Sequence, residues 1–347
     1  MRFLRIDCAG VSLMSKYGKI HVVYGDDRKG SCALVGGAVR ACGAGLDVGF
    51  IWFGSTDGSY AAVLEGIEGI DYVRCESREI SGRSYRNGES GRCAEAALDY
   101  ASAGSDGGLD VLILDGFLDS VDGADEIIAL MDYATDKEIE LMMCGSRCKD
   151  EIIERADYVS EIKNTKLPHA SWIYGREGDI CEICGDGKGK TTMLVGDAVS
   201  YAGDGKKVDF IQFMKDGTSS EVGILKNIQG VKYLCPGHHD FIDSGNSPTD
   251  EQREHAKLAL GYVYSSLDGG ADVVICDEIL TANGSMSVST EEIRKLIKYA
   301  KGKRVKLMMS GHSCKRERPW VVDCIYEVNK IKHPYYDGLR ARYGIEY

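Results

Sequence analysis

The stretch GDGKGKTT, residues 185–192, decides how the rest of the chain is read. It follows the β-prone run DICEIC and precedes TTMLVGDAVSYA, which has helical spacing and stops at Gly203. Glycines between a strand and a helix let backbone N–H groups close around phosphate oxygens, and the helix N-terminus attracts anions. The strict P-loop pattern has glycine where Cys184 stands. We expect a phosphate loop; the alternative is a glycine-rich turn with surface lysines.

Four side chains suit phosphate and metal chemistry. Lys190 can reach phosphates as a point charge, and the Thr191 hydroxyl can ligate Mg²⁺. Asp277 and Glu278 end the apolar run ADVVIC, at the carboxyl end of a predicted strand, where ligands of parallel sheets bind. The predicted metal ligands are Thr191, Asp277 and Glu278, and the predicted catalytic residues are Lys190 and Glu278. The alternative for the acidic pair is a helix N-terminus.

The chain contains an internal repeat. Shifted by 160 positions, residues 25–53 align with 185–213 without a gap, and 13 of the 29 positions are identical. Later segments match in the same order: ELMMCGSRC (140–148) with KLMMSGHSC (306–314), and ADYVSEIKNTKLP (156–168) with VDCIYEVNKIKHP (322–334). This order indicates a tandem duplication, with predicted domains 1–167 and 168–347.

The first copy has lost several parts of the nucleotide site at once. The changes replace Lys190 by Gly30, Gly187 by Asp27, Gly189 by Lys29, Glu278 by Gly116 and His333 by Leu167. The apolar positions are kept. We therefore expect the first copy to fold but not to bind a nucleotide productively.

Strand and helix patterns alternate in each copy, which predicts an α/β fold. In the second copy the strands are DICEIC, KVDFIQF, ADVVIC and RVKLMMS; the helices include one capped by Thr249 or Asp250 and a capped STEEIRKLIKYA. We predict two tandem P-loop-type (RecA-like) domains, each a mostly parallel sheet with helices on both faces.

Composition excludes several classes. The 347 residues carry a net charge of −12 and a pI near 5.2, which argues against a nucleic-acid partner. No apolar run reaches membrane-spanning length, and Asp7 interrupts the N-terminal run, so we expect neither a membrane span nor a signal peptide. The 13 scattered cysteines then indicate reduced thiols and a cytoplasmic protein. Cys181 and Cys184 should face opposite sides of a strand as packing residues.

From about residue 179 to 347 the chain resembles the P-loop corrinoid adenosyltransferases. The resemblance rests on GDGKGKTT, IQFMK (211–215), ICDEI (275–279) and SGH (310–312). Its most specific part is the ending DCIYEVNKIKHPYYDGLRARYGIEY. The first copy resembles the family only at scaffold positions.

The resemblance implies a transfer reaction of cobalamin biosynthesis or salvage, in which a Co(I) corrinoid attacks C5′ of ATP and triphosphate leaves. It implies ATP, Mg²⁺ and a corrinoid as ligands and a flavoprotein as electron donor. Lys190, the loop amides and Mg²⁺ would stabilise the leaving polyanion. Two alternatives remain: a P-loop ATPase that couples hydrolysis to a conformational change, and a non-catalytic corrinoid- or nucleotide-binding protein.

The resemblance extends the site beyond the loop. Family members remove the lower axial ligand of cobalt with aromatic residues of one loop, which corresponds here to CPGHHDFIDSG (235–245) and leaves Phe241 for that role. A zinc site of Cys235, His238, His239 and Asp240 is another interpretation of this loop, and a solvated loop is a third. The predicted ligand-binding residues are Gly185, Asp186, Gly187, Lys188, Gly189, Lys190, Thr191, Thr192, Lys215, Phe241, Lys332 and His333.

The family is typically dimeric, so the two copies are predicted to dock as an intramolecular pseudodimer, with further homo-oligomer formation left open. On this hypothesis the chain has one active site, in the second copy, and the first copy is a structural half. The rival hypothesis is that the first copy binds a different ligand or a partner protein.

Overall fold

The computed structural model of the chain describes residues 18–54, 58–75, 79–80, 83–84, 90–166, 178–237, 248–312, 320–334 and 341–346. Twelve strands form one continuous sheet in the order β11-β10-β12-β13-β9-β14-β8-β1-β7-β6-β2-β3. The division at residue 167 falls outside the described residues and stays a prediction.

The two copies supply six strands each to this sheet. The first copy contains β1 (Ile20–Gly25), α1 (Asp27–Gly43), β2 (Val48–Trp52), α2 (Ala61–Glu65), β3 (Ile70–Arg74), β4 (Glu79–Ile80), β5 (Arg83–Ser84), α3 (Ser90–Gly107), β6 (Val111–Asp115), α4 (Phe117–Ser120), α5 (Ala124–Asp136), β7 (Glu140–Gly145), α6 (Asp150–Arg155) and β8 (Tyr158–Lys166). The second contains β9 (Ile180–Cys184), α7 (Lys190–Gly203), β10 (Val208–Gln212), α8 (Glu221–Leu225), β11 (Val231–Leu234), α9 (Asp250–Asp268), β12 (Val273–Asp277), α10 (Ile279–Gly284), α11 (Thr290–Lys303), β13 (Lys306–Ser310) and β14 (Cys324–Lys332).

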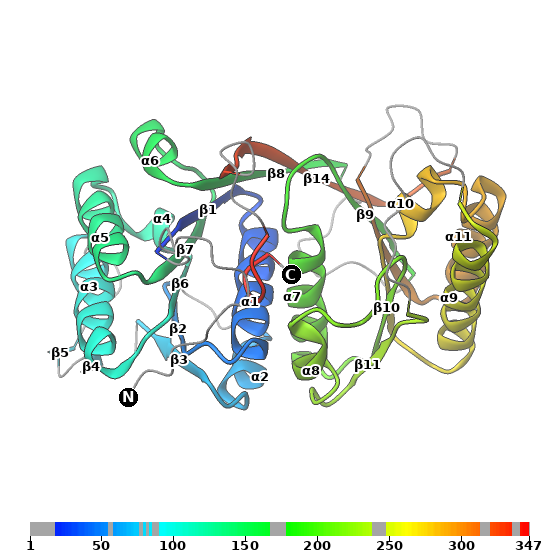
Figure 1. The fold of residues 1–347 in the computed structure, drawn as a ribbon, viewed down its shortest axis with the longest axis horizontal. Coiled ribbons are helices and arrows are strands. Elements are labelled where there is room, and N and C mark those ends of the chain that lie inside the picture. The colour runs from blue at the N-terminus through cyan, green and yellow to red at the C-terminus, as the bar shows by residue number, and fades with distance from the viewer. Residues whose placement is uncertain are drawn as a thin grey trace, which may run out of the picture.

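The sheet confirms the predicted fold class. Within each copy, every strand pair of the twelve-stranded sheet is parallel, and the copies meet where β8 and β14 pair antiparallel. A separate antiparallel pair is formed by β4 and β5. Helices α1, α2, α7 and α8 lie in the middle, and the outer helices lie beyond the sheet on either side (Figure 1). The predicted caps are also present, because Thr249 and Ser289 each form a capping box at the start of α9 and α11.

Helices α1 and α7 pack against each other through glycines that the repeat places at equivalent positions. A Cβ atom on Gly36 would lie 1.8 Å from the carbonyl oxygen of Thr192, and one on Gly196 would lie 1.8 Å from that of Cys32. Only glycine permits so close an approach of two backbones. A hydrophobic core that contains residues of both copies surrounds this contact, and each copy has a further core of its own. The copies are therefore joined by a shared sheet and a shared core.

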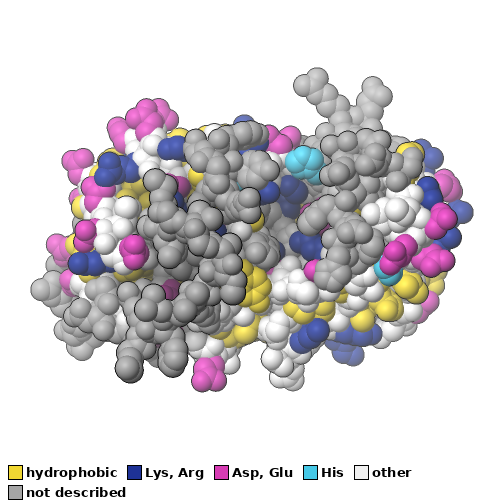
Figure 2. Space-filling view, in the orientation of Figure 1, with side chains coloured by type: hydrophobic (Ala, Val, Ile, Leu, Met, Phe, Trp, Pro, Cys, Tyr) yellow, Lys and Arg dark blue, Asp and Glu magenta, His cyan; other side chains and the backbone are white. Residues whose placement is uncertain are grey.

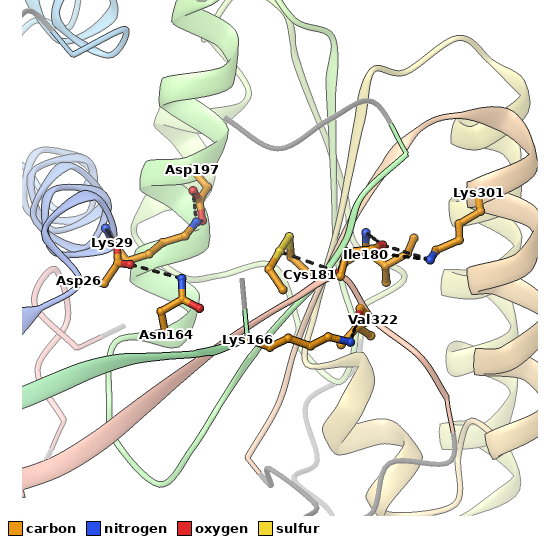
Figure 3. Close-up of a disulfide and its surroundings, with 11 residues drawn as sticks. Asp26, Lys29, Asn164, Lys166, Ile180, Cys181, Asp197, Lys301 and Val322 are labelled. Atoms are coloured by element: carbon orange, nitrogen blue, oxygen red, sulfur yellow. Dashed lines mark hydrogen bonds and ion pairs between the residues drawn. A yellow bond between two sulfur atoms is a disulfide. The ribbon is translucent and has the colours of Figure 1, made fainter. Parts of the chain in front are cut away.

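The cysteines correct one prediction. Cys181 and Cys324 form a disulfide across the neighbouring strands β9 and β14, where the two residues are in register (Figure 3). Cys184 is also disulfide-bonded. The expectation that all thiols are reduced is therefore wrong, and the cysteines no longer support a cytoplasmic location. Cys181 and Cys184 do pack into cores on opposite sides of the sheet, as predicted. Among the described residues, no helix is long and apolar enough to cross a bilayer.

Candidate active site

The loop between β9 and α7 has a conformation that requires its glycines. Gly185 has φ +117°, and a Cβ atom there would lie 2.2 Å from the Val328 carbonyl oxygen on β14. Gly189, at φ +95°, is the residue before α7. The Gly187 N–H donates to the same Val328 oxygen at 2.8 Å. The loop is therefore fixed against β14, with the N-terminus of a 14-residue helix behind it.

Lys190 is folded onto this loop. Its ammonium group donates to the carbonyl oxygens of Gly185 at 2.9 Å and Gly187 at 2.7 Å. Burial lowers the pKa of Lys190, and the negative charge of Glu278 partly opposes that effect. Among the described residues, the hydrogen-bond acceptors of Lys190 are these neutral carbonyls. A buried ammonium in such surroundings would gain from an anion, so the position suits a phosphate group.

The predicted metal ligands gather around Asp277, which is fully buried. Its carboxylate accepts hydrogen bonds from Thr191 Oγ1 at 3.1 Å, Ser310 Oγ at 2.8 Å and Gln212 Nε2 at 3.2 Å. The Lys215 ammonium lies 3.3 Å from Thr191 Oγ1 and 3.6 Å from Asp277 Oδ2, so a cation already occupies this position.

This set of oxygen donors fits Mg²⁺. Hydroxyl and carboxylate oxygens are the ligands that Mg²⁺ prefers, and it completes its shell with waters and substrate phosphates. Within the described part of the chain, no cluster of three or more His, Cys, Asp or Glu could hold a metal by itself.

Glu278 has an unusual backbone. Its φ of +65° is in the left-handed region, which costs a non-glycine residue about 1–2 kcal/mol. Ser310 Oγ accepts a hydrogen bond from its N–H at 2.9 Å, and Thr281 donates to its carboxylate. These hydrogen bonds hold Glu278 in the strained conformation, and the residue lines the cavity described below. Backbone strain of this kind is found at functional sites.

A cavity of about 760 Å³ opens against the loop, and residues of both copies line it. Some lysine and arginine side chains are visible near the middle of the molecular face, and others lie toward its lower and right edges (Figure 2). The predicted residues that line the cavity are Asp186, Gly187, Lys188, Gly189, Lys190, Thr191, Thr192, Lys215, Glu278, Lys332 and His333. Gly185 and Asp277 are not among the lining residues. Each accepts a hydrogen bond from a residue that is, Gly185 from Lys190 and Asp277 from Thr191. Phe241, His238, His239 and Asp240 lie outside the described residues.

Two of these residues lie at the joint between the copies. Lys332 donates to the carbonyl oxygen of Glu154 in the first copy at 2.6 Å. His333 packs edge-on against Tyr158, with ring centres 4.9 Å apart, and burial lowers its pKa. Neither arrangement assigns a chemical role, so the roles of both residues stay predictions.

Sequence reasoning missed the part of the cavity lining that the first copy provides. A further wall comes from residues 341–346, hereafter the tail segment. The missed lining residues of these two regions are His21, Val22, Val23, Ala33, Leu34, Gly37, Arg40, Met142, Tyr158, Ser160 and Ile162 of the first copy, and Ala341, Ile345 and Glu346 of the tail segment. Those missed in the second copy are Met193, Met214, Asp216, Thr218, Ser219, Thr281, His312 and Val328. The repeat contained one signal for the first-copy residues. At two of these positions the first copy has a basic side chain, His21 or Arg40, where the second copy has Cys181 or Ser200.

The equivalent place in the first copy is filled. Lys29 and Asp197, which stand where the open site has Gly189 and Gly37, form a buried ion pair with nitrogen–oxygen distances of 2.5 and 2.7 Å (Figure 3). Burial alone would lower the pKa of Lys29, but the charge of Asp197 raises it above the ordinary value. Lys29 also lies over the ring of Tyr326.

Comparison with known proteins follows the duplication. The family model for ATP:corrinoid adenosyltransferase BtuR/CobO/CobP matches residues 16–179 and, separately, 176–347. Together the matches span nearly the whole chain. The molecule is a parallel α/β protein with a glycine-rich loop between strand and helix. The chain belongs to the ATP:corrinoid adenosyltransferase family, with two copies of the family unit in tandem.

Curated relatives agree with this assignment. The chain is 28% identical over 199 residues to the corrinoid adenosyltransferase of Escherichia coli K12, which covers 96% of that protein and 56% of this chain. It is 26% identical over 175 residues to corrinoid adenosyltransferase CobA of Salmonella typhimurium LT2, covering 86% of that protein and 49% of this chain. The corrinoid adenosyltransferase of Pseudomonas aeruginosa is 23% identical over 199 residues, covering 94% of it and 56% of this chain.

Proposed function

We propose that this chain transfers the 5′-deoxyadenosyl group of ATP to the cobalt of a reduced corrinoid. The Co(I) electron pair forms the cobalt–carbon bond to C5′, the C5′–oxygen bond breaks, and triphosphate leaves with that bonding pair. Family membership gives the reaction class. The observation that carries the assignment is the cluster of Lys190, Thr191 and Glu278 on a cavity that residues of both copies line.

In this proposal the loop binds the triphosphate. The ammonium group of Lys190 is partly desolvated and already held on the loop. Little reorganisation is therefore needed as negative charge grows on the leaving group. Thr191, Asp277 and Glu278 would hold the Mg²⁺ that neutralises the same oxygens. Lys188 and Lys215 add positive charge at the edge of the loop, where both line the cavity.

We further propose one active site per chain, in the domain formed by residues 168–347, with domain 1–167 as its partner half. The open loop supports this for the second copy, and the Lys29–Asp197 ion pair argues against a nucleotide in the first. A flavoprotein electron donor and a cytoplasmic location remain part of the proposal. The donor follows from the need for a strongly reduced cobalt.

The test is an anaerobic assay with ATP, Mg²⁺ and chemically reduced cob(I)alamin. The expected products are light-sensitive adenosylcobalamin and free triphosphate. Lys190→Ala should reduce the rate by roughly 10²–10³-fold, as removal of a group that stabilises transition-state charge does. Lys298→Ala, which changes an exposed lysine of α11 outside the cavity, serves as the matched control and should keep the rate.

Two results would overturn the proposal. One is phosphate release from ATP without any corrinoid and no adenosylcobalamin, which would favour an ATPase. The other is product formation that Lys190→Ala leaves unchanged, which would move the site away from this loop.

A further inference from the structure

The tail segment belongs to the second copy by sequence but packs on the first. Gly344, at φ +87°, lies so close to α1 that a Cβ atom there would be 2.4 Å from that of Ala44. Ile345 is buried in the core shared by the two copies. Arg40 of α1 donates to the carbonyl oxygen of Glu346 at 2.7 Å. The segment therefore has a defined seat on the first copy.

A buried cluster of charges fixes that seat. Arg342 donates from both terminal nitrogens to Glu140 of β7, at 2.7 and 3.1 Å, and neither side chain is more than 4% exposed. His21 of β1 contacts the same carboxylate at 2.5 Å, and Arg342 also binds Glu346 at 2.8 Å. Two-pronged arginine–carboxylate contacts fix orientation as well as position.

The repeat shows that only the first copy can seat the segment in this way. The residue equivalent to Glu140 in the second copy is Lys306, which would repel Arg342. The residue equivalent to His21 is Cys181, which is held in the disulfide. The first copy thus keeps a charge pattern that serves the open site, although its own loop is altered.

The wall that results suits an apolar ring rather than a polyphosphate. Ala341 and Ile345 line the cavity together with Val22, Val23 and Met142. The two guanidinium groups nearby, Arg40 and Arg342, are both paired with carboxylates, so their charge is already neutralised. The lysines that line the cavity lie on its loop side, so the triphosphate is expected there.

We propose that the tail segment forms the wall against which the corrinoid binds, and that Glu140 of the first copy is the positioning residue that holds it through Arg342. This inference rests on the proposed function. The altered copy then has a role of its own, because it presents a wall of the site that the second copy cannot hold for itself.

The experiment compares Glu140→Gln with Lys306→Gln, the change at the equivalent position of the second copy, which lies outside the cavity. Steady-state kinetics are measured with varied cob(I)alamin at saturating ATP, and the reverse. Glu140→Gln should raise the KM for cob(I)alamin roughly ten-fold through misplacement of the wall. Its KM for ATP should stay within about two-fold of the unmodified chain, and Lys306→Gln should change neither KM. Arg342→Lys keeps the charge without the two-pronged contact and should raise the same KM by a smaller factor.

The outcomes separate the two proposals. An unmodified chain that makes no adenosylcobalamin defeats the proposed function itself. An active chain in which Glu140→Gln and Arg342→Lys leave the KM for cob(I)alamin unchanged, or raise only the KM for ATP, overturns the inference alone. If Glu140→Gln does not fold, the Arg342→Lys result decides.

Discussion

The loops that follow β1 and β9 are equivalent in sequence and in the sheet, yet their surroundings are opposite. After β9, a Cβ atom on Gly189 would meet nothing within 4 Å, Gly189 and Gly37 both line the cavity, and Lys190 donates to two loop carbonyls. After β1, Lys29 and the facing Asp197 fill the same space with an ion pair. Two glycines that line the cavity in one place thus correspond to two paired charges in the other.

Much of the shared framework survives this exchange. Ser31 donates to Asp115 at 2.7 Å, as Thr191 does to Asp277. Cys144 contacts Asp115 where Ser310 contacts Asp277. A hydroxyl on a buried aspartate is therefore a structural feature of both copies, and only its neighbours make it part of a site.

The largest expected effect comes from breaking the ion pair that fills the first copy. Lys29→Ala should reduce the free energy of unfolding by about 3–5 kcal/mol, because the buried Asp197 carboxylate loses its countercharge. The double variant Lys29→Met with Asp197→Val removes both charges and should stay within about 1 kcal/mol of the unmodified chain. Urea unfolding measures both. If Lys29→Ala were as stable as the unmodified chain, the Lys29–Asp197 ion pair would not be needed to stabilise the first copy.

The second test asks whether the equivalent hydroxyls differ in function. Thr191→Ala should lower kcat/KM roughly 10²-fold, about 2.7 kcal/mol, since it removes a predicted metal ligand. Ser31→Ala removes the same contact in the first copy and should leave kcat/KM unchanged, with a stability loss of about 1 kcal/mol from the lost hydrogen bond. Equal losses of activity in the two variants would contradict a single site per chain.

The third test uses Lys306, the buried counterpart of Glu140. Burial, reinforced by the positive charge of Lys29, lowers its pKa to about 8. The folded state therefore binds this proton less tightly than the unfolded state, so the cost is present in full below pH 8. It disappears as pH rises toward the ordinary lysine pKa, a gain of about 3 kcal/mol at most. Lys306→Met should be more stable than the unmodified chain at pH 7, and the difference should shrink by pH 10. A pH-independent difference would contradict the lowered pKa.

Local features of this architecture were predictable from sequence, and contacts between the copies were not. The loop, its flanking strand and helix, and the caps at Thr249 and Ser289 depend on residues a few positions apart. The Cys181–Cys324 disulfide joins residues separated by 143 positions, and it depends on which strands become neighbours. The identity of Gly36 and Gly196 is visible in the repeat. Its reason, a close approach of two helices, appears only when α1 and α7 are packed.

The smallest expected effect separates strain from function at the residue after the buried aspartate. Glu278 and Gly116 are equivalent, and both have left-handed backbones, at φ +65° and +74°. Glu278→Gly should relieve about 1–2 kcal/mol of strain and cost about 0.5–1 kcal/mol in chain entropy, a net gain of roughly 0.5 kcal/mol. The same change should lower the transferase rate at least about ten-fold if Glu278 acts on the leaving group.

The reverse change in the first copy is the matched control. A Cβ atom on Gly116 would lie 3.7 Å from its nearest neighbours, so Gly116→Glu meets no clash at Cβ and should pay mainly the backbone cost. It should lose roughly 0.5 kcal/mol of stability and keep the full rate. Thermal unfolding and the cob(I)alamin assay on the two variants then give opposite signs for stability and unequal effects on rate. A Glu278→Gly variant that is less stable than the unmodified chain would contradict the predicted relief of strain. A variant that also keeps the full rate would show that Glu278 has no part in the reaction, and that the equivalence with Gly116 is structural only.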